Sequence, residues 1–250
     1  MKQTFYMLTC LTFLVAGPSV APVPVQRHSV SADFVITRAG NKSVETSTTE
    51  VRDASNVVVW LTPLDRAAEP PAVPPAGRDQ PPRLVQRNKT FEPHLLVVPV
   101  GTLVVFPNED PFFHNIFSLY DGRRFDLGLY ESGMSRSVRF DRSGVSFLFC
   151  NIHAEMSAVV IALDTNYFAV SNHSGHVVIP DVPEGSYRLN IWYELATPEE
   201  LQALTRVVSI LNANVALGAI RVSEASDLRP AHKNKYGLDY VPPPQSDYDR

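Results

Sequence analysis

Short apolar runs separated by polar turns recur along most of the chain, and this pattern predicts β-strands. Residues 57–61 and 102–106 are rich in β-branched and aromatic side chains, and residues 137–140 alternate polar and apolar positions, as half-buried strands do. Further strands are expected at 34–38, 95–98, 112–118, 145–150, 157–164, 167–170, 176–179, 187–193, 206–211 and 216–222. The fold class is therefore expected to be all-β, with sandwich architecture.

Helical signals are confined to one stretch near residue 200. Thr197 is a capping residue, Pro198 occupies the first helical position and Glu200 the third, which favours a short helix ending near Leu204.

Residues 24–33 carry no clear strand pattern and are expected to be a flexible start.

Prolines separate the early strands from the central ones. Residues 65–84 are expected to form a Pro-rich linker, because proline cannot donate to a sheet. The prolines from the end of the preceding strand through this segment are Pro63, Pro70, Pro71, Pro74, Pro75, Pro81 and Pro82.

A metal-binding pattern follows the aromatic strand that ends at Phe149. Cys150, His153 and Met156 form Cys-x-x-His-x-x-Met, and His114 lies upstream after another strand. Thiolate, imidazole and a weak thioether together favour copper. Zinc is the competing metal, but structural zinc sites use four strong ligands and methionine is a poor one. Without metal, the cysteine and methionine would be ordinary core residues.

These segments resemble the cupredoxin family, the small blue copper proteins. The resemblance covers roughly residues 85–165 and is strongest to amicyanin in the spacing of the ligand loop, although Ile152 stands where amicyanin has proline. It implies a Greek-key β-sandwich that binds one type 1 copper ion through His114, Cys150, His153 and Met156. It also implies a redox protein partner docking near His153, and a role for Asn115 in tethering the ligand loop near the thiolate.

The run from Ser174 to Leu189 resembles a second family, the carboxypeptidase-regulatory-like, transthyretin-like β-sandwich. In that family a strand like 57–61 directly precedes this hairpin. We therefore expect a second small sandwich split into residues 31–64 and 166–224, with the cupredoxin domain of 85–165 inserted between them. The alternative is that 31–64 supplies early cupredoxin strands. Residues 225–250 are expected to be an extended tail.

The N-terminus has the composition of a secretory signal. Residues 1–23 contain Lys2, an apolar core and the small residues Ser19 and Ala21, which together indicate a signal peptide and a periplasmic or otherwise exported protein. Cys10 would leave with this segment, so Cys150 would be the only cysteine of the mature chain. A solitary thiol in an oxidising compartment favours a metal ligand.

Charge and motifs narrow the function further. The formal net charge is −4 with no basic cluster, which argues against a nucleic-acid partner. No apolar stretch after the signal is long enough to span a membrane. Nucleophile motifs, phosphate loops and zinc-helix motifs are absent from the sequence, so no enzymatic activity is expected. Two functions remain: single-electron transfer, or a binding role such as copper delivery, storage or adhesion.

Overall fold

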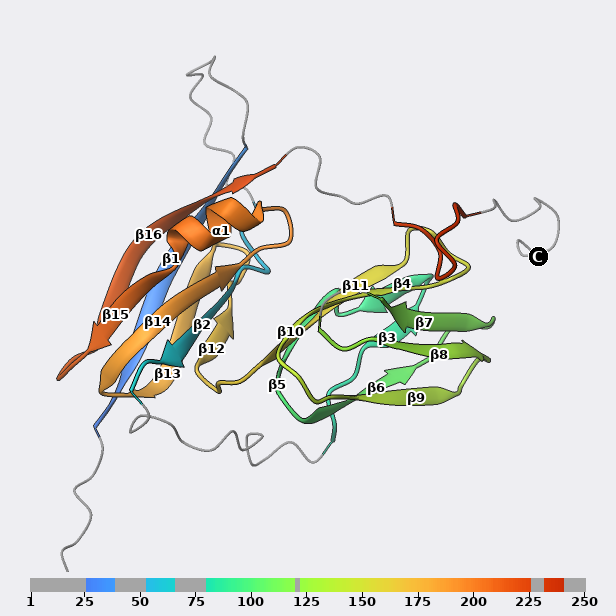
Figure 1. The fold of residues 1–250 in the computed structure, drawn as a ribbon, viewed down its shortest axis with the longest axis horizontal. Helices are drawn as coiled ribbons and strands as arrows, with labels where there is room; N and C mark the ends of the chain where they lie inside the picture. The colour runs from blue at the N-terminus through green and yellow to red at the C-terminus, as the bar shows by residue number, and fades with distance from the viewer. Residues whose placement is uncertain (1–25, 39–52, 66–79, 120–121, 226–231, 241–250) are drawn as a thin grey trace, which may run out of the picture.

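The computed structural model describes residues 26–38, 53–65, 80–119, 122–225 and 232–240, and it confirms the all-β prediction. In these residues the chain forms sixteen strands and one short helix, arranged as two layered bodies side by side (Figure 1). The predicted signal peptide lies outside the described residues. Among the helices of the described ranges, none has the length and apolar character needed to cross a membrane.

The first body, here called the split sandwich, combines strands from both ends of the chain. Its three-stranded sheet has the order β13 (His176–Pro183), β1 (Arg27–Arg38), β16 (Val215–Glu224). Its four-stranded sheet has the order β12 (Phe168–Val170), β2 (Val58–Pro63), β14 (Gly185–Trp192), β15 (Arg206–Ile210). The strands β1 and β2 therefore pair with strands that follow the Cys-x-x-His-x-x-Met motif, not with those around it.

The two sheets of the split sandwich enclose one apolar core. Val59 lies directly opposite Ile191, and Leu61 lies opposite Leu189, in the antiparallel pairing of β2 with β14. All four side chains belong to the same buried cluster. Residues more than a hundred positions apart in the sequence thus share one core.

Strand β1 begins earlier than the sequence predicts. It starts at Arg27, and Val30 is only 1% exposed, so the expectation of a flexible start at 24–33 is wrong for its described residues. The pairing of β1 with β13 shifts register between His28 and Val30. Such an irregularity weakens the period-two pattern on which strand prediction depends.

The helix α1 (Pro198–Leu204) is confirmed at the predicted place. Thr197 Oγ1 accepts a hydrogen bond from the Glu200 backbone N–H at 3.3 Å. The Glu200 carboxylate accepts from the Ser223 N–H at 2.6 Å. This second bond fastens the helix to β16.

The second body, here called the central sandwich, lies between the two halves of the split one in the sequence. Its five-stranded sheet has the order β5 (Leu95–Pro99), β11 (Ser157–Leu163), β10 (Gly144–Phe149), β7 (His114–Ser118), β8 (Phe125–Tyr130). The opposite layer contains the pair β6 (Thr102–Pro107) and β9 (Ser135–Phe140) and the hairpin β3 (Val85–Arg87) and β4 (Thr90–Glu92). Between these layers lies a second buried cluster, which includes Phe106, Phe140 and Leu148.

The hairpin β3–β4 and the strand β8 were not predicted from the sequence. Isolated bridges pair Arg83 with Val105 and Gln86 with Asn108, which adds the hairpin to the edge of β6. Leu84 is fully buried, so the end of the Pro-rich segment packs against the central sandwich.

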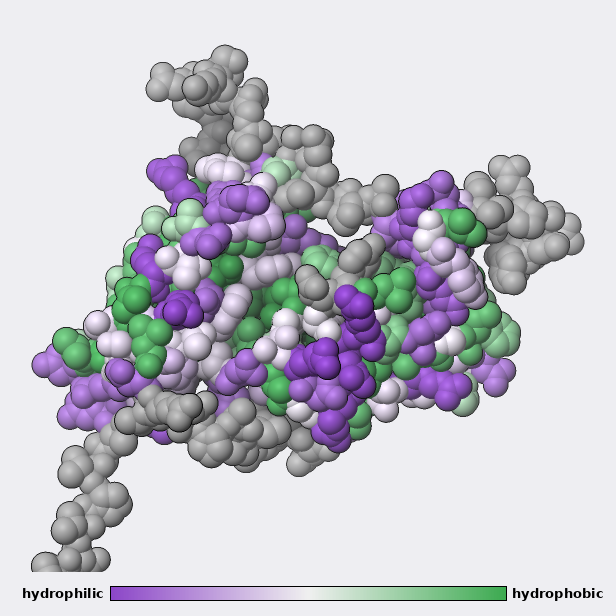
Figure 2. All heavy atoms as spheres, viewed as in Figure 1, coloured by the Kyte–Doolittle hydropathy of each residue, from purple (hydrophilic) through white to green (hydrophobic). Residues whose placement is uncertain are grey.

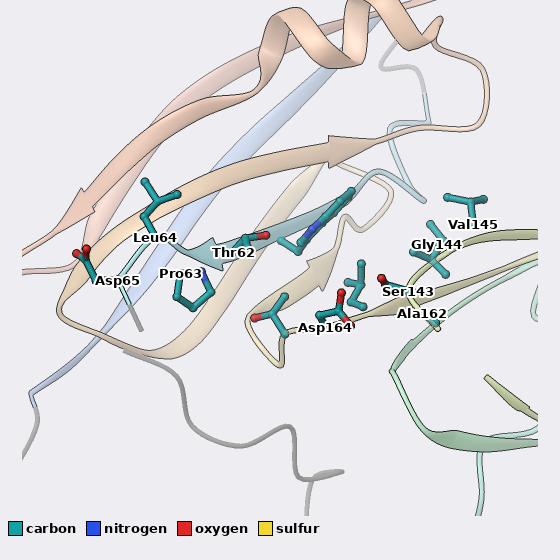
Figure 3. Close-up of a pocket in the computed structure, with 13 residues that line it drawn as sticks. Thr62, Pro63, Leu64, Asp65, Ser143, Gly144, Val145, Ala162 and Asp164 are labelled. Carbon is teal, nitrogen blue, oxygen red and sulfur yellow. The ribbon is translucent and has the colours of Figure 1, made fainter. Parts of the chain in front are cut away.

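The two bodies meet through a third apolar cluster. Val58 of β2 is buried with Val159 and Ile161 of β11, and both tryptophans, Trp60 and Trp192, pack against them. In the space-filling view, apolar side chains gather in the hollow between the bodies (Figure 2). A cavity of about 560 Å³ opens beside this contact, with lining residues from both bodies (Figure 3).

Candidate metal centre

The Cys-x-x-His-x-x-Met motif forms a tight connection between two neighbouring strands. Strand β10 ends at Phe149 and β11 begins at Ser157. The Cys150 N–H donates to the Met156 carbonyl at 3.0 Å, and the Met156 N–H donates to the His153 carbonyl at 3.2 Å. These bonds fold the loop back on itself, so that three potential ligands come from seven consecutive residues.

His114 enters the same site from a different strand. It is the first residue of β7, which lies between β10 and β8 in the sheet. The Cys150 Sγ atom lies 3.7 Å from His114 Nδ1 and 3.6 Å from His153 Nδ1. The three potential ligand atoms all lie within 4.8 Å of one another. The structure thus brings together three of the four residues named from the sequence.

The fourth residue, Met156, lies in the same core as the cysteine. Its side chain is fully buried, as are those of Cys150 and His114. His153 is the exception, because its ring is only half-buried. Phe112 contacts both imidazoles, with centroid distances of 5.2 Å to His114 and 5.7 Å to His153. The candidate ligands are therefore shielded from solvent, except for one imidazole near the surface.

Burial keeps these groups uncharged while no metal is bound. Loss of solvent lowers the pKa of His114, and burial together with the neighbouring His114 lowers the pKa of His153 to about 4. Burial raises the pKa of the Cys150 thiol, although backbone N–H groups of the loop and of Asn115 partly offset this effect. At neutral pH both imidazoles retain a lone pair, and metal binding would displace the thiol proton.

A buried carboxylate that the sequence analysis did not single out contacts the far side of His114. The His114 Nε2 atom lies 2.7 Å from Asp110 Oδ2. The sequence signal was available, since an acidic residue stands four positions before the histidine. Acidic residues are common in surface loops, however, and only the fold shows that this one is buried.

Asn115 makes the contact near the thiolate that the resemblance implied, through its backbone N–H, but its side chain is engaged elsewhere. Its side-chain amide donates to Asp126 Oδ1 at 2.8 Å, which links β7 to β8. Only its backbone N–H is directed at the Cys150 thiol. The side chain is thus used within the sheet and not across the ligand loop.

The C-terminal residues 232–240, here called the strap, hold the ligand loop instead. The Lys235 backbone N–H donates to Asn151 Oδ1 at 3.0 Å. The Tyr240 hydroxyl donates to the Cys150 carbonyl at 2.7 Å, and the His232 ring stacks on Phe149 with centroids 4.0 Å apart. This part of the expected extended tail therefore lies against the site, as the red segment beside the β10–β11 loop in Figure 1 shows.

The remaining histidines are distributed over both bodies and do not extend the site. His94 contacts Glu194 at 2.6 Å, across the two bodies. His173 and His176 pair with Asp53 and Asp33, respectively. Over the described ranges, His114, Cys150 and His153 make the one group of three or more His, Cys, Asp or Glu side chains with metal-site spacing.

Comparisons with known proteins give partial structural matches. No family model matches the chain, and no curated protein matches its sequence. A purple cupredoxin from Nitrosopumilus maritimus matches with 24% identity over 33% of this chain and 99% of its own, at a TM-score of 0.31. A point mutant of amicyanin in its oxidised state matches with 19% identity over 35% of this chain and 87% of its own, at a TM-score of 0.32.

A third match is to part of a larger enzyme. The Cu-containing nitrite reductase from Thermus scotoductus SA-01 shares 25% identity over 42% of this chain and 28% of its own, at a TM-score of 0.34. The neighbours are thus cupredoxins or copper proteins, and each covers less than half of this chain. The case for a metal centre rests on the residues and distances given above.

Proposed function

We propose that this protein binds one type 1 copper ion and carries single electrons between redox partners. Cys150, His114 and His153 would supply the strong ligands, and Met156 the weak axial one. The observation that supports this most directly is the convergence of two imidazole Nδ1 atoms on one buried thiol, at 3.7 and 3.6 Å. Two histidines, a cysteine and a methionine are the donor set of blue-copper sites.

The donor set fits copper better than zinc. Structural zinc sites are closed by a fourth strong ligand, whereas the group of strong donors here has three members. The remaining candidate ligand is Met156, whose thioether is a soft and weak donor. Copper accepts such a donor and zinc rarely does.

Copper would supply a one-electron couple, and the protein would supply a rigid site for it. The ligand loop is closed by two backbone hydrogen bonds, and β7 holds His114 in the sheet beside it. Ligands that are already in place need to move little when the charge of the metal changes. Because Cys150 and Met156 are fully buried, water is also kept away from the thiolate.

The burial pattern favours electron transfer over copper delivery. Handing copper to another protein requires ligands that a partner can reach, whereas Cys150, His114 and Met156 are fully buried. An electron can pass through the half-buried His153 ring without opening the site. We therefore assign partner docking to the surface near His153, where Ile152 is 41% and Phe113 is 54% exposed. The proposal includes no enzymatic reaction.

Metal loading of the purified protein tests this function. We expect the Cu(II) form to absorb visible light intensely and to be reduced and reoxidised reversibly. Cys150→Ser is the matched variant, because it removes the thiolate and leaves both imidazoles. A folded wild-type protein whose copper complex is colourless and redox-silent would exclude the electron carrier.

The proposal places the protein outside the cytoplasm, on the basis of the N-terminal sequence pattern. Residues 1–23 would be removed on export, which N-terminal sequencing of the protein recovered from an exported fraction would detect. A mature chain that still begins at Met1 would overturn this assignment.

We also assign the split sandwich, from 31–64 and 166–224, to the carboxypeptidase-regulatory-like type, with the central domain at 85–165 as an insertion.

A further inference from the structure

Asp110 is a buried carboxylate with a full set of hydrogen-bond donors. It is only 4% exposed. Its Oδ1 atom accepts from the Asn88 N–H at 2.6 Å, and its Oδ2 atom accepts from the Lys89 N–H at 2.9 Å. His114 Nε2 lies 2.7 Å from the same Oδ2 atom. A carboxylate buried this deeply needs such partners, because an unpaired buried charge is very costly.

The turn of the hairpin β3–β4 is shaped to hold this carboxylate. Asn88 and Lys89 have φ values of 55° and 58°, in the left-handed region that residues other than glycine rarely adopt. Their successive backbone N–H groups converge on Asp110, in the manner of backbone concavities that bind anions. The turn and the carboxylate therefore stabilise each other.

The chain on the other side of Asp110 is also fixed. The Asn108 side chain accepts from the Asp110 N–H at 3.1 Å and donates to the carbonyls of Phe112 and Tyr130, at 2.8 and 3.2 Å. Asn108 is fully buried. The segment between β6 and β7 is thus pinned at both ends, so Asp110 has little freedom to leave His114.

This contact determines which nitrogen of His114 carries the proton. An ionised carboxylate can only accept hydrogen bonds, so Nε2 must be the N–H donor in the neutral ring. The lone pair is then on Nδ1, which is the atom that lies 3.7 Å from the Cys150 Sγ. Histidine ligands of metals commonly make such a contact on the opposite ring nitrogen.

We propose that Asp110 is a positioning residue for the metal centre: it locks His114 in the tautomer and orientation that present Nδ1 to the metal, and its charge favours the oxidised ion. This inference rests on the proposed copper site. A negative charge next to a ligand stabilises the more positive oxidation state, because opposite charges attract more strongly at low dielectric. Asp110 therefore lowers the reduction potential of the site.

The first test uses the unmodified, metal-free protein and needs no copper. Nitrogen-15 NMR of the imidazole groups distinguishes the two neutral tautomers. The expected result is that His114 is protonated on Nε2 alone. A ring protonated mainly on Nδ1 would overturn the proposal, whatever happens on mutation.

The second test compares Asp110→Asn with Glu109→Gln. Both variants remove one negative charge at adjacent positions, but the Glu109 carboxylate pairs with Arg83 and Arg87 at the surface and does not contact His114. We expect Asp110→Asn to keep the visible absorption, to raise the reduction potential and to weaken copper binding about 10–100-fold. Glu109→Gln should leave the reduction potential and the copper affinity close to the wild-type values.

The outcomes separate this inference from the proposed function. If the wild-type copper protein is colourless and redox-silent, the proposed function fails, and the tautomer measurement still tests the role of Asp110. If the wild type is coloured but Asp110→Asn has the same potential and copper affinity as Glu109→Gln, the role of Asp110 is refuted. If Asp110→Asn does not fold, the tautomer of the wild-type ring decides.

Discussion

The Tyr240 hydroxyl donates a hydrogen bond to the backbone carbonyl of Cys150 at 2.7 Å, across ninety positions of sequence. This bond joins the C-terminal strap directly to the residue that would bind the metal most strongly. The strap is further held by Lys235, which contacts Asn151 through its backbone and Asp126 through its ammonium group at 2.8 Å. The ligand loop is therefore supported from the end of the chain as well as from its own sheet.

Removing the Tyr240 hydroxyl should loosen this support. Tyr240→Phe is expected to destabilise the strap by about 0.5–1.5 kcal/mol for the lost bond to Cys150, the usual net contribution of one hydrogen bond. It also removes the contact of the hydroxyl with His232 Nδ1 at 3.2 Å. Hydrogen exchange in residues 232–240 and in the ligand loop should become faster, and copper should dissociate faster. Tyr236→Phe is the matched control, because Tyr236 is on the same strap but 71% exposed. Equal exchange rates in the two variants would contradict a role for the hydrogen bond.

The proposed ligands should differ in how their loss changes the copper spectrum. Cys150→Ser is expected to abolish the intense visible band, since the thiolate is its source. Met156→Leu should retain the band and raise the reduction potential, because a weak donor to Cu(II) is lost while the apolar volume is kept. Absorption spectroscopy and voltammetry check both expectations. Loss of the band in both variants would contradict the axial assignment of Met156.

The metal-free protein should lose stability in mild acid. The ordinary histidine pKa is 6.5, and in the folded protein that of His153 is lowered to about 4 while that of His114 is lowered as well. Between about pH 4 and pH 6.5 the unfolded chain binds more protons than the folded one. The free energy of unfolding is therefore largest above pH 6.5 and decreases as the pH falls through this range. Urea unfolding at several pH values measures this slope.

His153→Gln provides the comparison for the pH experiment. It removes one of the two imidazoles whose pKa is lowered and keeps a polar side chain of similar length. The variant should therefore show a shallower loss of stability between neutral and acidic pH. An unchanged slope would show that His153 does not cause the effect.

The core of the split sandwich can be tested by pairing two residues that lie on either side of the central sandwich in the sequence. Ile191→Ala should cost about 2–5 kcal/mol, since it removes a large side chain from a packed core. Val59 lies directly opposite in the strand pairing, so Val59→Ala combined with Ile191→Ala should show a coupling energy of about 0.5–3 kcal/mol.

A pair from separate cores gives the matched control for this cycle. Val104 belongs to the core of the central sandwich. Combining Val104→Ala with Ile191→Ala should therefore be additive within about 0.5 kcal/mol. Additive effects for Val59 with Ile191 would contradict the split arrangement.

The sequence could predict those features that depend on local pattern. The ligand loop is a short motif between two strongly apolar strands, so Cys150 and His153 were found together. His114 was found because its own strand is also strongly apolar. The helix α1 was predicted because Thr197 and Pro198 are specific start signals. In each case the information lies within a few residues.

Features that depend on distant partners were missed. Strands β3 and β4 have three residues each and form mainly because β6 offers them an edge, which no local pattern records. Strand β8 contains Gly128 with a φ of 67°, a weak strand signal. Asp110 is distinguished only by the N–H groups of Asn88 and Lys89 that fold over it. The strap depends on contacts with Cys150 and Asn151, far away in the sequence.

The contact between the two bodies contains both tryptophans of the chain, Trp60 and Trp192. They pack against Val159 and Ile161 of β11, the strand that leaves the ligand loop directly after Met156. Tryptophan fluorescence of the intact protein therefore originates at this seam and not inside either core. A shift in the wavelength of this emission when the metal site is loaded or emptied would mean that the contact between the two bodies responds to the metal, whereas a loss of intensity alone can arise from quenching by Cu(II).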